Sequence, residues 1–216
     1  MNRSPAILTI GHSRHPLARF IGLLEGAGAT AVADVRSAPV SRFSPHFNKA
    51  ALAAALAVRR IDYIFLGNKL GGRPGQPAMY TKGVADYGKM AASNEFRAGI
   101  ALLTEAAGRH RVAAMCSEAD PLDCHRCLLV ARALARDGVE VAHILSSGAV
   151  MPHLEAEDRL LDLAGLAEPG LLLASRDERL AEAYRAAPAS ALMPFGERLR
   201  GEPRHAGASQ YPEWLA

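Results

Sequence analysis

The chain has 216 residues, of which 50% are hydrophobic, and its formal net charge at pH 7 is +3. This length suits one domain with an extension or two small domains, and it is enough to bury a sizeable core. The mild positive charge permits an anionic ligand, but the chain has no concentrated basic block typical of a dedicated nucleic-acid binder. Three cysteines lie close together, an odd number that argues against a disulfide framework and favours a reducing compartment.

No apolar run reaches membrane-spanning length, and the apolar residues before Gly11 are too few for a signal peptide. We therefore expect a cytoplasmic protein with no membrane partner.

Short apolar runs alternate along the chain with segments of helical period. The expected strands are 6–10, 31–36, 61–66, 112–115 and 139–145. The expected helices between them are 17–24, 49–58, 93–107 and 128–135. This alternation predicts an α/β fold with a mostly parallel five-stranded sheet, helices on both faces and right-handed crossovers.

Two parts of the chain depart from this alternation. Residues 67–92 are irregular and rich in glycine and proline, a composition typical of a lid or binding loop. Beyond Gly148 the pattern becomes helical, at 153–164 and 176–186. We therefore expect an α/β core domain at 1–149 and a helical extension at 150–216 that packs on the core to cover its leucines.

Polar residues follow four of the expected strands, where a parallel sheet usually binds its ligands. They are His12 and Ser13, Asp34 and Arg36, Gly71 and Gly72, and Cys116 and Glu118. Asp34 and Arg36 are two positions apart and so face one side of their strand. They are interpreted either as a buried ion pair that fixes the loops or as part of the pocket.

All three cysteines lie between the fourth strand and the last core helix. Cys116 ends an apolar strand, where it is either a small buried hydrophobe or a thiol whose pKa is lowered by a helix N-terminus and an arginine. His125 and Arg126 fall in the first helical turn, where the helix dipole disfavours cations. We expect them to meet an anion there, either a ligand or Glu118, or Arg126 to pair with Asp34.

Cys124-His125-Arg126-Cys127 forms a C-x-x-C pattern, with Cys116 upstream. Three thiolates and a histidine could hold zinc or an iron–sulfur cluster, and Cys124 and Cys127 on one helix face could form a redox pair. The chain has no second cysteine pair to complete a structural zinc site. We therefore expect no bound metal and no cofactor.

These motifs, taken together over about residues 6–146, resemble the domain of unknown function 488 family. They are Thr9-Ile10-Gly11-His12-Ser13, Asp34-Val35-Arg36 with Pro39 and Ser41, Leu70-Gly71-Gly72, Cys116-x-Glu118-x-Asp120-Pro121-x-x-Cys124-His125-Arg126, and His143-Ile144. Cys127 and the segment after residue 150 lie outside this pattern. The resemblance implies little about activity, because the biochemistry of the family is largely unassigned.

A more distant, fold-level likeness is to rhodanese-type and cysteine-phosphatase-type domains. Their catalytic loop is short, whereas ten positions separate Cys116 from Arg126 here.

The first hypothesis is an enzyme that binds an anionic, phosphate-bearing small molecule or nucleic acid at the strand ends. Its expected catalytic residues are His12, Cys116, Glu118 and His125. Its expected substrate-binding residues are Ser13, Asp34, Arg36, Gly71, Gly72, Tyr80, Cys124 and Arg126. The alternatives are a non-catalytic nucleic-acid or nucleotide-binding module, and a metal or redox module built on the three cysteines. The sequence leaves open the reaction, the reactive cysteine and the oligomeric state.

Overall fold

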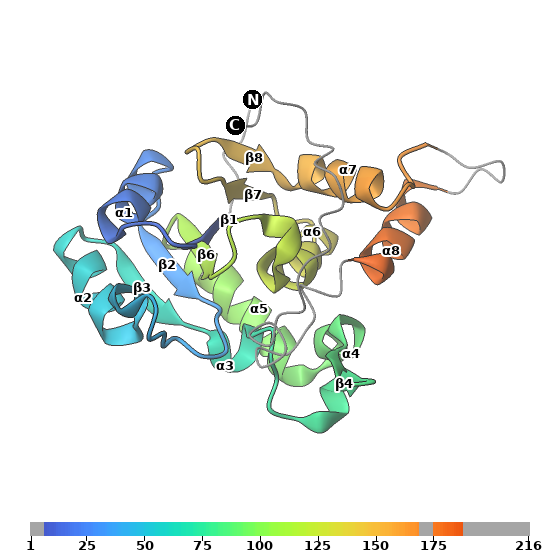
Figure 1. Cartoon of the computed structure of the whole chain (residues 1–216), viewed down its shortest axis with the longest axis horizontal. Helices are drawn as coiled ribbons and strands as arrows, with labels where there is room; N and C mark the ends of the chain where they lie inside the picture. The colour runs from blue at the N-terminus through green and yellow to red at the C-terminus, as the bar shows by residue number, and fades with distance from the viewer. Residues whose placement is uncertain (1–6, 169–174, 188–216) are drawn as a thin grey trace.

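The computed structural model describes residues 7–168 and 175–187, which form three layers around a central sheet (Figure 1). The sheet has six strands in the order β3-β2-β6-β1-β7-β8. Their bounds are β1 Ile7–Gly11, β2 Ala31–Asp34, β3 Asp62–Phe65, β6 Val112–Cys116, β7 Val141–Ile144 and β8 Val150–Pro152. Within this sheet, the described pairs that join β1, β2, β3, β6 and β7 are parallel, and β8 pairs antiparallel with β7. The predicted α/β class with a mostly parallel sheet is confirmed.

The strand count differs from the prediction by one. The chain turns back at Gly148, whose φ is +98°, and residues 150–152 then pair with β7. A side chain would be strained at this φ, so glycine suits the turn. Three residues that include a proline give no recognisable strand pattern, and proline is tolerated because β8 is an edge strand.

Helices α1 and α2 cover one face of the sheet. They span Leu17–Gly26 and Lys49–Val58. Phe20 and Leu24 from α1 and Leu52 and Leu56 from α2 are fully buried with the sheet residues of this face. Pro16 directly precedes α1, which matches the preference for proline at a helix start.

The other face is covered by α5 and by the helix that follows residues 116–125, the cysteine-rich loop. Helix α5 spans Asn94–Ala107, and the Ser93 side chain caps it by accepting a hydrogen bond from the Phe96 amide. The second helix begins as a π-helix at Arg126–Ala131 and continues as α6, Arg132–Arg136. Every residue of the π-helix is buried, so this segment is part of the core.

The irregular segment 67–92 carries short elements of its own. They are α3 Gly67–Leu70, a 3-10 turn at Pro77–Met79, the two-stranded β4 Tyr80–Thr81 and β5 Val84–Ala85, and α4 Tyr87–Ala92. Figure 1 shows this segment to one side of the sheet, next to the end of α5. Two further 3-10 turns, Pro45–Phe47 and Pro121–Asp123, lie in the loops after β2 and β6.

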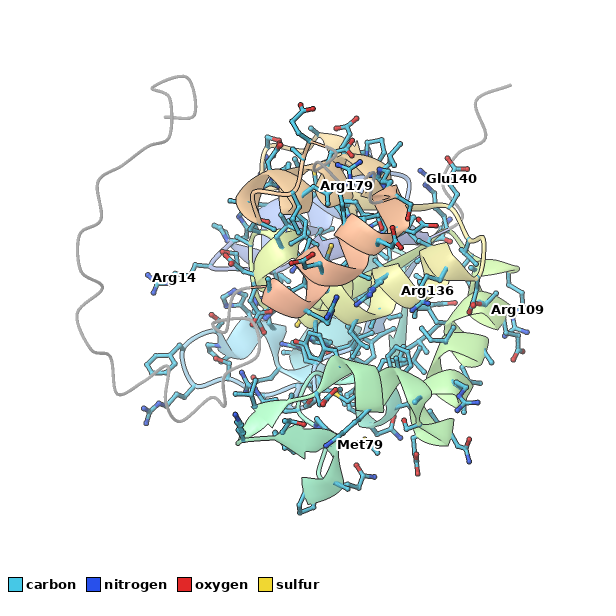
Figure 2. The ribbon with its side chains drawn as sticks, turned by 90° about the vertical axis from the view of Figure 1, so that its right-hand side faces the viewer. Arg14, Met79, Arg109, Arg136, Glu140 and Arg179 are labelled. Atoms are coloured by element: carbon cyan, nitrogen blue, oxygen red, sulfur yellow. The ribbon has the colours of Figure 1, made fainter. Side chains whose placement is uncertain are left out.

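Beyond β8, helices α7 His153–Leu163 and α8 Arg176–Ala186 pack against each other and against the core. Leu160 and Leu180 share a buried cluster with Leu122 and Leu128 from the cysteine-rich loop and the π-helix. In Figure 2, Arg179 of α8 and Met79 of the 67–92 segment lie toward opposite ends of this side of the molecule. The predicted boundary between a core at 1–149 and an extension at 150–216 stays a prediction, and residues 169–174 and 188–216 of that extension lie outside the described ones.

None of the described helices is both long enough and apolar enough to cross a lipid bilayer.

Candidate functional site

A cavity of about 820 Å³ opens at the edge where the parallel strands β1, β2 and β6 end. Seven of the residues predicted for the site line this cavity: His12, Arg36, Gly72, Cys116, Glu118, Cys124 and His125. Side chains that the sequence did not single out also line it, among them Ser37, Arg42, Asn48, Arg73, Tyr87 and Asp123. The sheet topology therefore brings most of the predicted residues to one place.

The other five predicted residues lie outside this lining. Asp34 is fully buried beside Arg36, and Ser13 is held to the cysteine-rich loop by its amide, which donates to the Ser117 carbonyl at 2.8 Å. Gly71 lines a neighbouring cavity of about 240 Å³, and the Tyr80 hydroxyl donates to the Pro74 carbonyl at 2.9 Å. Arg126 is fully buried behind the loop.

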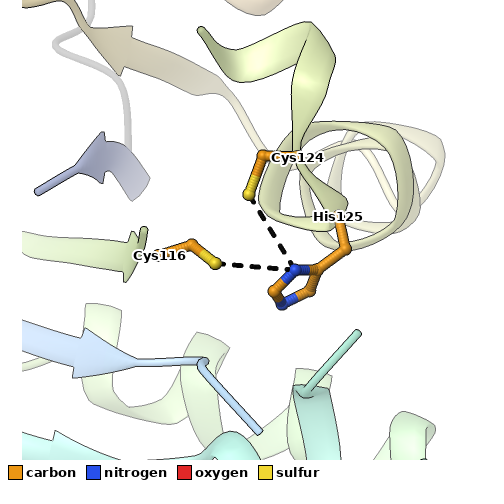
Figure 3. A group of neighbouring side chains, drawn as sticks. All are labelled: Cys116, Cys124 and His125. Carbon is orange, nitrogen blue, oxygen red and sulfur yellow. Dashed lines mark hydrogen bonds between the residues drawn. The ribbon is translucent and has the colours of Figure 1, made fainter. Parts of the chain in front are cut away.

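Cys116, Cys124 and His125 meet at the cavity (Figure 3), and Glu118 joins them there. Glu118 Oε2 lies 3.1 Å from Cys116 Sγ and 3.0 Å from Cys124 Sγ. His125 Nδ1 lies 3.6 Å from Cys116 Sγ and 3.9 Å from Cys124 Sγ, as the dashed lines mark. His125 Nε2 is 3.0 Å from the Val35 carbonyl, which can only accept, so Nε2 carries a proton and Nδ1 faces the sulfurs.

The electrostatics of this group separate the two thiols. Burial alone would raise the pKa of Cys124, but a hydrogen bond from Cys116 and the charges of Arg126 and His125 hold it well below its usual value. The pKa of Cys116 is raised well above its usual value, first by burial and then by its interaction with Cys124. Within the pair, these interactions favour the thiolate form at Cys124 and the thiol form at Cys116.

Glu118 and His125 respond to this thiolate. The pKa of Glu118 is raised, first by burial and then by the negative charge of Cys124. Burial lowers the pKa of His125, but the Cys124 charge outweighs burial and the net direction is upward. This arrangement favours a thiolate–imidazolium pair next to a carboxyl group that tends to keep its proton.

Asp34 and Arg36 form the buried ion pair that the sequence predicted as one of two interpretations. Arg36 Nη2 lies 2.6 Å from Asp34 Oδ2, and the Tyr63 hydroxyl donates to the same oxygen at 2.6 Å. Arg36 Nη2 also donates to the Phe47 carbonyl at 2.8 Å. Arg36 therefore reaches the cavity as a cation that is firmly held from behind.

His12 completes this group as a neutral imidazole. The pKa of His12 is lowered to about 4, first by burial and then by the charge of Arg36. Its Nε2 lies 3.2 Å from Arg36 Nη1 and its Nδ1 lies 2.9 Å from the Ser13 carbonyl. Since the carbonyl only accepts, Nδ1 carries the proton and Nε2 accepts from Arg36. His12 also stacks on Phe47, with 4.2 Å between ring centroids.

Arg126 fixes the cysteine-rich loop through the backbone. Its Nη1 donates to the Glu118 carbonyl at 2.7 Å and its Nη2 to the Ala119 carbonyl at 2.9 Å. The expected partners were the carboxylates of Glu118 or Asp34, or a bound anion. Backbone carbonyls supply the negative partial charge instead. Gly11 passes so close to this loop that an added Cβ would lie 1.8 Å from the Glu118 carbonyl oxygen.

The C-x-x-C spacing suggested that Cys124 and Cys127 share a helix face, but in the structure they do not. Cys124 has extended backbone, with φ −139° and ψ 139°, so it precedes the helix. Cys127 lies within the π-helix, and its Sγ is 3.8 Å from His143 Nε2 and 4.0 Å from His153 Nδ1. Cys127, His143 and His153 thus form a second buried group.

This second group was missed by reasoning from the sequence. One signal was present: His143 is a polar residue inside an apolar strand, and such a residue needs a partner. His153 gave no such signal, because it is the pairing of β7 with β8 that places His153 next to His143.

The family profile described as Domain of unknown function DUF488 matches residues 16–133. No curated protein and no solved structure matches the chain.

Proposed function

The chain belongs to the DUF488 family, whose description assigns no activity, and we propose that it is an enzyme that acts on an anionic, phosphate-bearing substrate with Cys124 as its nucleophile. The observation that carries this proposal is the meeting of the Cys124 thiolate, Glu118 and His125 at an 820 Å³ cavity. A thiolate with a neighbouring imidazolium is the usual form of an activated cysteine nucleophile.

The charge of the cavity supports an anionic substrate. Arg36, Arg42 and Arg73 line it, against Glu118 and Asp123. Arg36 is anchored by Asp34, so its guanidinium is already oriented and little side-chain entropy is lost when an anion binds. Guanidinium groups pair with phosphate and carboxylate oxygens alike, and three of them at one cavity favour a ligand that carries several negative oxygens, as a phosphate group does.

The proposed chemistry has two steps. In the first, the Cys124 sulfur forms a bond to the electrophilic centre of the substrate while the bond to the leaving group breaks, and protonated Glu118 gives its proton to that group. In the second, Glu118 takes a proton from water, the water oxygen attacks the same centre, and the thiolate leaves. His125 balances the charge of the thiolate, and Cys116 donates a hydrogen bond to it.

The first test is alkylation of the full-length protein by iodoacetamide across pH, with each modified cysteine identified by mass spectrometry. Cys124 is expected to react well below the pH at which an ordinary thiol ionises. Cys127 is a matched control, since it is buried to the same degree and its pKa is raised by burial. Reaction of Cys124 only at high pH, together with Cys127, would contradict the proposal.

The second test concerns the substrate class. Pyrophosphate and a panel of nucleotides are expected to protect Cys124 from alkylation, and protection is expected to weaken in Arg36→Lys because lysine lacks the fork that pairs with phosphate. A neutral molecule of similar size is the control. Equal protection by neutral and anionic molecules would contradict the anionic class.

A second candidate function is a metal centre formed by Cys116, Cys124 and His125, because their ligand atoms lie within 4.8 Å of one another. The Val35 carbonyl holds the other ring nitrogen of His125, which is the usual second-shell arrangement of a histidine ligand. The alkylation experiment separates the two functions. A metal would shield Cys124 until a chelator removes it, whereas a free nucleophile reacts equally with and without chelator.

A further inference from the structure

The second buried group joins three elements that are distant in the sequence. Cys127 comes from the π-helix, His143 from β7 and His153 from the first residue of α7. Their exposed fractions are 1%, 0% and 5%, and their ligand atoms lie within 4.8 Å of one another. The group is separate from the cavity described above, because none of the three residues lines it.

The distances between the donor atoms suit a tetrahedral metal ion. His143 Nε2 lies 3.0 Å from His153 Nδ1, and Cys127 Sγ lies 3.8 Å and 4.0 Å from these two nitrogens. With ordinary zinc bond lengths, a tetrahedral site needs about 3.3 Å between two nitrogens and about 3.6 Å between sulfur and nitrogen. The three atoms are therefore within a few tenths of an ångström of a zinc-binding arrangement.

In each histidine ring, the nitrogen that faces away from the group of three contacts another residue. His143 Nδ1 lies 2.7 Å from the hydroxyl of Thr9, its neighbour across the β1–β7 pairing. His153 Nε2 lies 3.3 Å from the Tyr184 hydroxyl and 3.7 Å from Glu157 Oε1. Metal-bound histidines almost always donate their second N–H to such a partner, which fixes the tautomer that leaves the first nitrogen free.

From this geometry we infer that Cys127, His143 and His153 bind one zinc ion, with the fourth tetrahedral position left to a water molecule. The ion ties the π-helix and β7 to α7, and so holds the segment beyond β8 against the sheet. Cys127, His153 and Tyr184 lie outside the motifs that the chain shares with the family, so the complete set of ligands is not part of that shared pattern. The inference is independent of the proposed function, because the two sites share no residue.

The competing arrangement is metal-free. In it His143 and His153 share one hydrogen bond, and the chain of contacts continues from Thr9 to Tyr184. The two arrangements place the same residues together but differ in the ionisation of Cys127. Only the metal site makes Cys127 a thiolate, because its pKa is otherwise raised by burial. A measurement that detects a metal–thiolate bond therefore separates them.

The experiment uses the full-length chain with Cys116→Ser and Cys124→Ser, in which Cys127 is the only cysteine that remains of three. Cobalt(II) is titrated into the metal-free protein as a spectroscopic substitute for zinc. One equivalent is expected to give a thiolate-to-cobalt charge-transfer absorption, and zinc is expected to displace it. A folded protein, judged by circular dichroism, that shows no such absorption would overturn the inference.

Further variants in that background test the ligands. His153→Asn is expected to weaken cobalt binding more than 100-fold, and Tyr184→Phe about 10-fold through the outer partner. Unchanged binding in His153→Asn would overturn the site. Where the double cysteine background does not fold, the thermal shift given by zinc serves instead. The shift should be kept in Cys124→Ser, which lacks the other candidate metal centre, and lost when Cys127→Ser is added to Cys124→Ser. A shift that survives in that pair of substitutions contradicts the inference.

Discussion

Arg126 binds the main chain of Glu118, and the side chain of Glu118 contacts the two cysteines. The Arg126 guanidinium donates to the Glu118 carbonyl at 2.7 Å, while Glu118 Oε2 lies 3.1 Å and 3.0 Å from the two sulfurs. Glu118 thus contacts the buried Arg126 guanidinium through its carbonyl group and the two thiols through its carboxyl group. The position of the carboxyl group in the site depends on a fully buried arginine that does not line the cavity.

Arg126→Met is therefore expected to lower stability, and it also removes a charge that lowers the pKa of Cys124. It removes two hydrogen bonds to a charged group, each of which contributes about 1.5–3 kcal/mol. We expect the free energy of unfolding to fall by about 3–5 kcal/mol, measured by urea denaturation. Arg136→Met is the control, because Arg136 is exposed at the end of α6 and should change stability by less than about 0.5 kcal/mol. Similar small losses in both variants would contradict the structural role of Arg126.

A methyl group at position 72 is expected to disturb the site without replacing any of its catalytic side chains. An added Cβ at Gly72 would lie 2.7 Å from His125 Cγ and 2.8 Å from His125 Nδ1, so the ring must shift. Gly72→Ala should therefore raise the pH at which Cys124 is alkylated, because the imidazolium moves away from the thiolate. Gly75→Ala is the control in the same segment, since nothing lies within 4 Å of its added Cβ. Identical alkylation profiles for the two variants would refute this coupling.

The stability of the protein is expected to fall in acid partly because of His12. The pKa of His12 is lowered to about 4 in the folded state, so between pH 6.5 and pH 4 the unfolded chain binds the proton and the folded one does not. Stability therefore rises with pH across this window and is lost as pH falls, by about 3 kcal/mol at pH 4 from this group. His12→Gln keeps an acceptor for Arg36, so its free energy of unfolding should fall by about 3 kcal/mol less between pH 6.5 and pH 4. His15→Gln, at a partly exposed site, should leave the fall unchanged.

Asp34→Asn is expected to cost about 3–5 kcal/mol, because it leaves the buried Arg36 charge without its partner. The change preserves the volume of the side chain, so the loss can be assigned to charge rather than to a cavity. Asp62→Asn is the control on the adjacent strand, where the side chain is 68% exposed and its His110 contact is 3.6 Å long. Thermal or urea denaturation of both variants measures the difference. A loss for Asp34→Asn no larger than that for Asp62→Asn would show that the ion pair is not needed for stability.

The sheet and much of the site could be predicted because they follow from local pattern. Apolar runs identified every parallel strand, and parallel strands bring the residues after them to one edge. His12, Arg36 and Cys116, which lie at or just after the ends of β1, β2 and β6, line one cavity for this reason. Tyr80 does not, because its place depends on how the 67–92 segment folds, and glycine and proline in that segment indicate turns without fixing their direction.

The partners of Arg126 and the start of the π-helix could not be predicted from the sequence. The helix dipole indicated that Arg126 needed negative charge nearby, but carbonyl groups of the adjacent loop supply it as well as a carboxylate does. A π-helix has no recognisable residue pattern, and Cys124 and Cys127 fall on different sides because the helix begins after Cys124.

The strand order also constrains how the chain can fold as it is synthesised. Strands β1 and β2 are not neighbours; both pair with β6, which lies between them. A nascent chain that ends before Val112 therefore has no partner for the inner edges of β1 and β2. These edges stay open to other chains until β6 emerges from the ribosome, a period in which fragments are prone to aggregate. The strand that ends this exposure carries Cys116 at its end, so closure of the sheet and assembly of the thiol site belong to one late folding step.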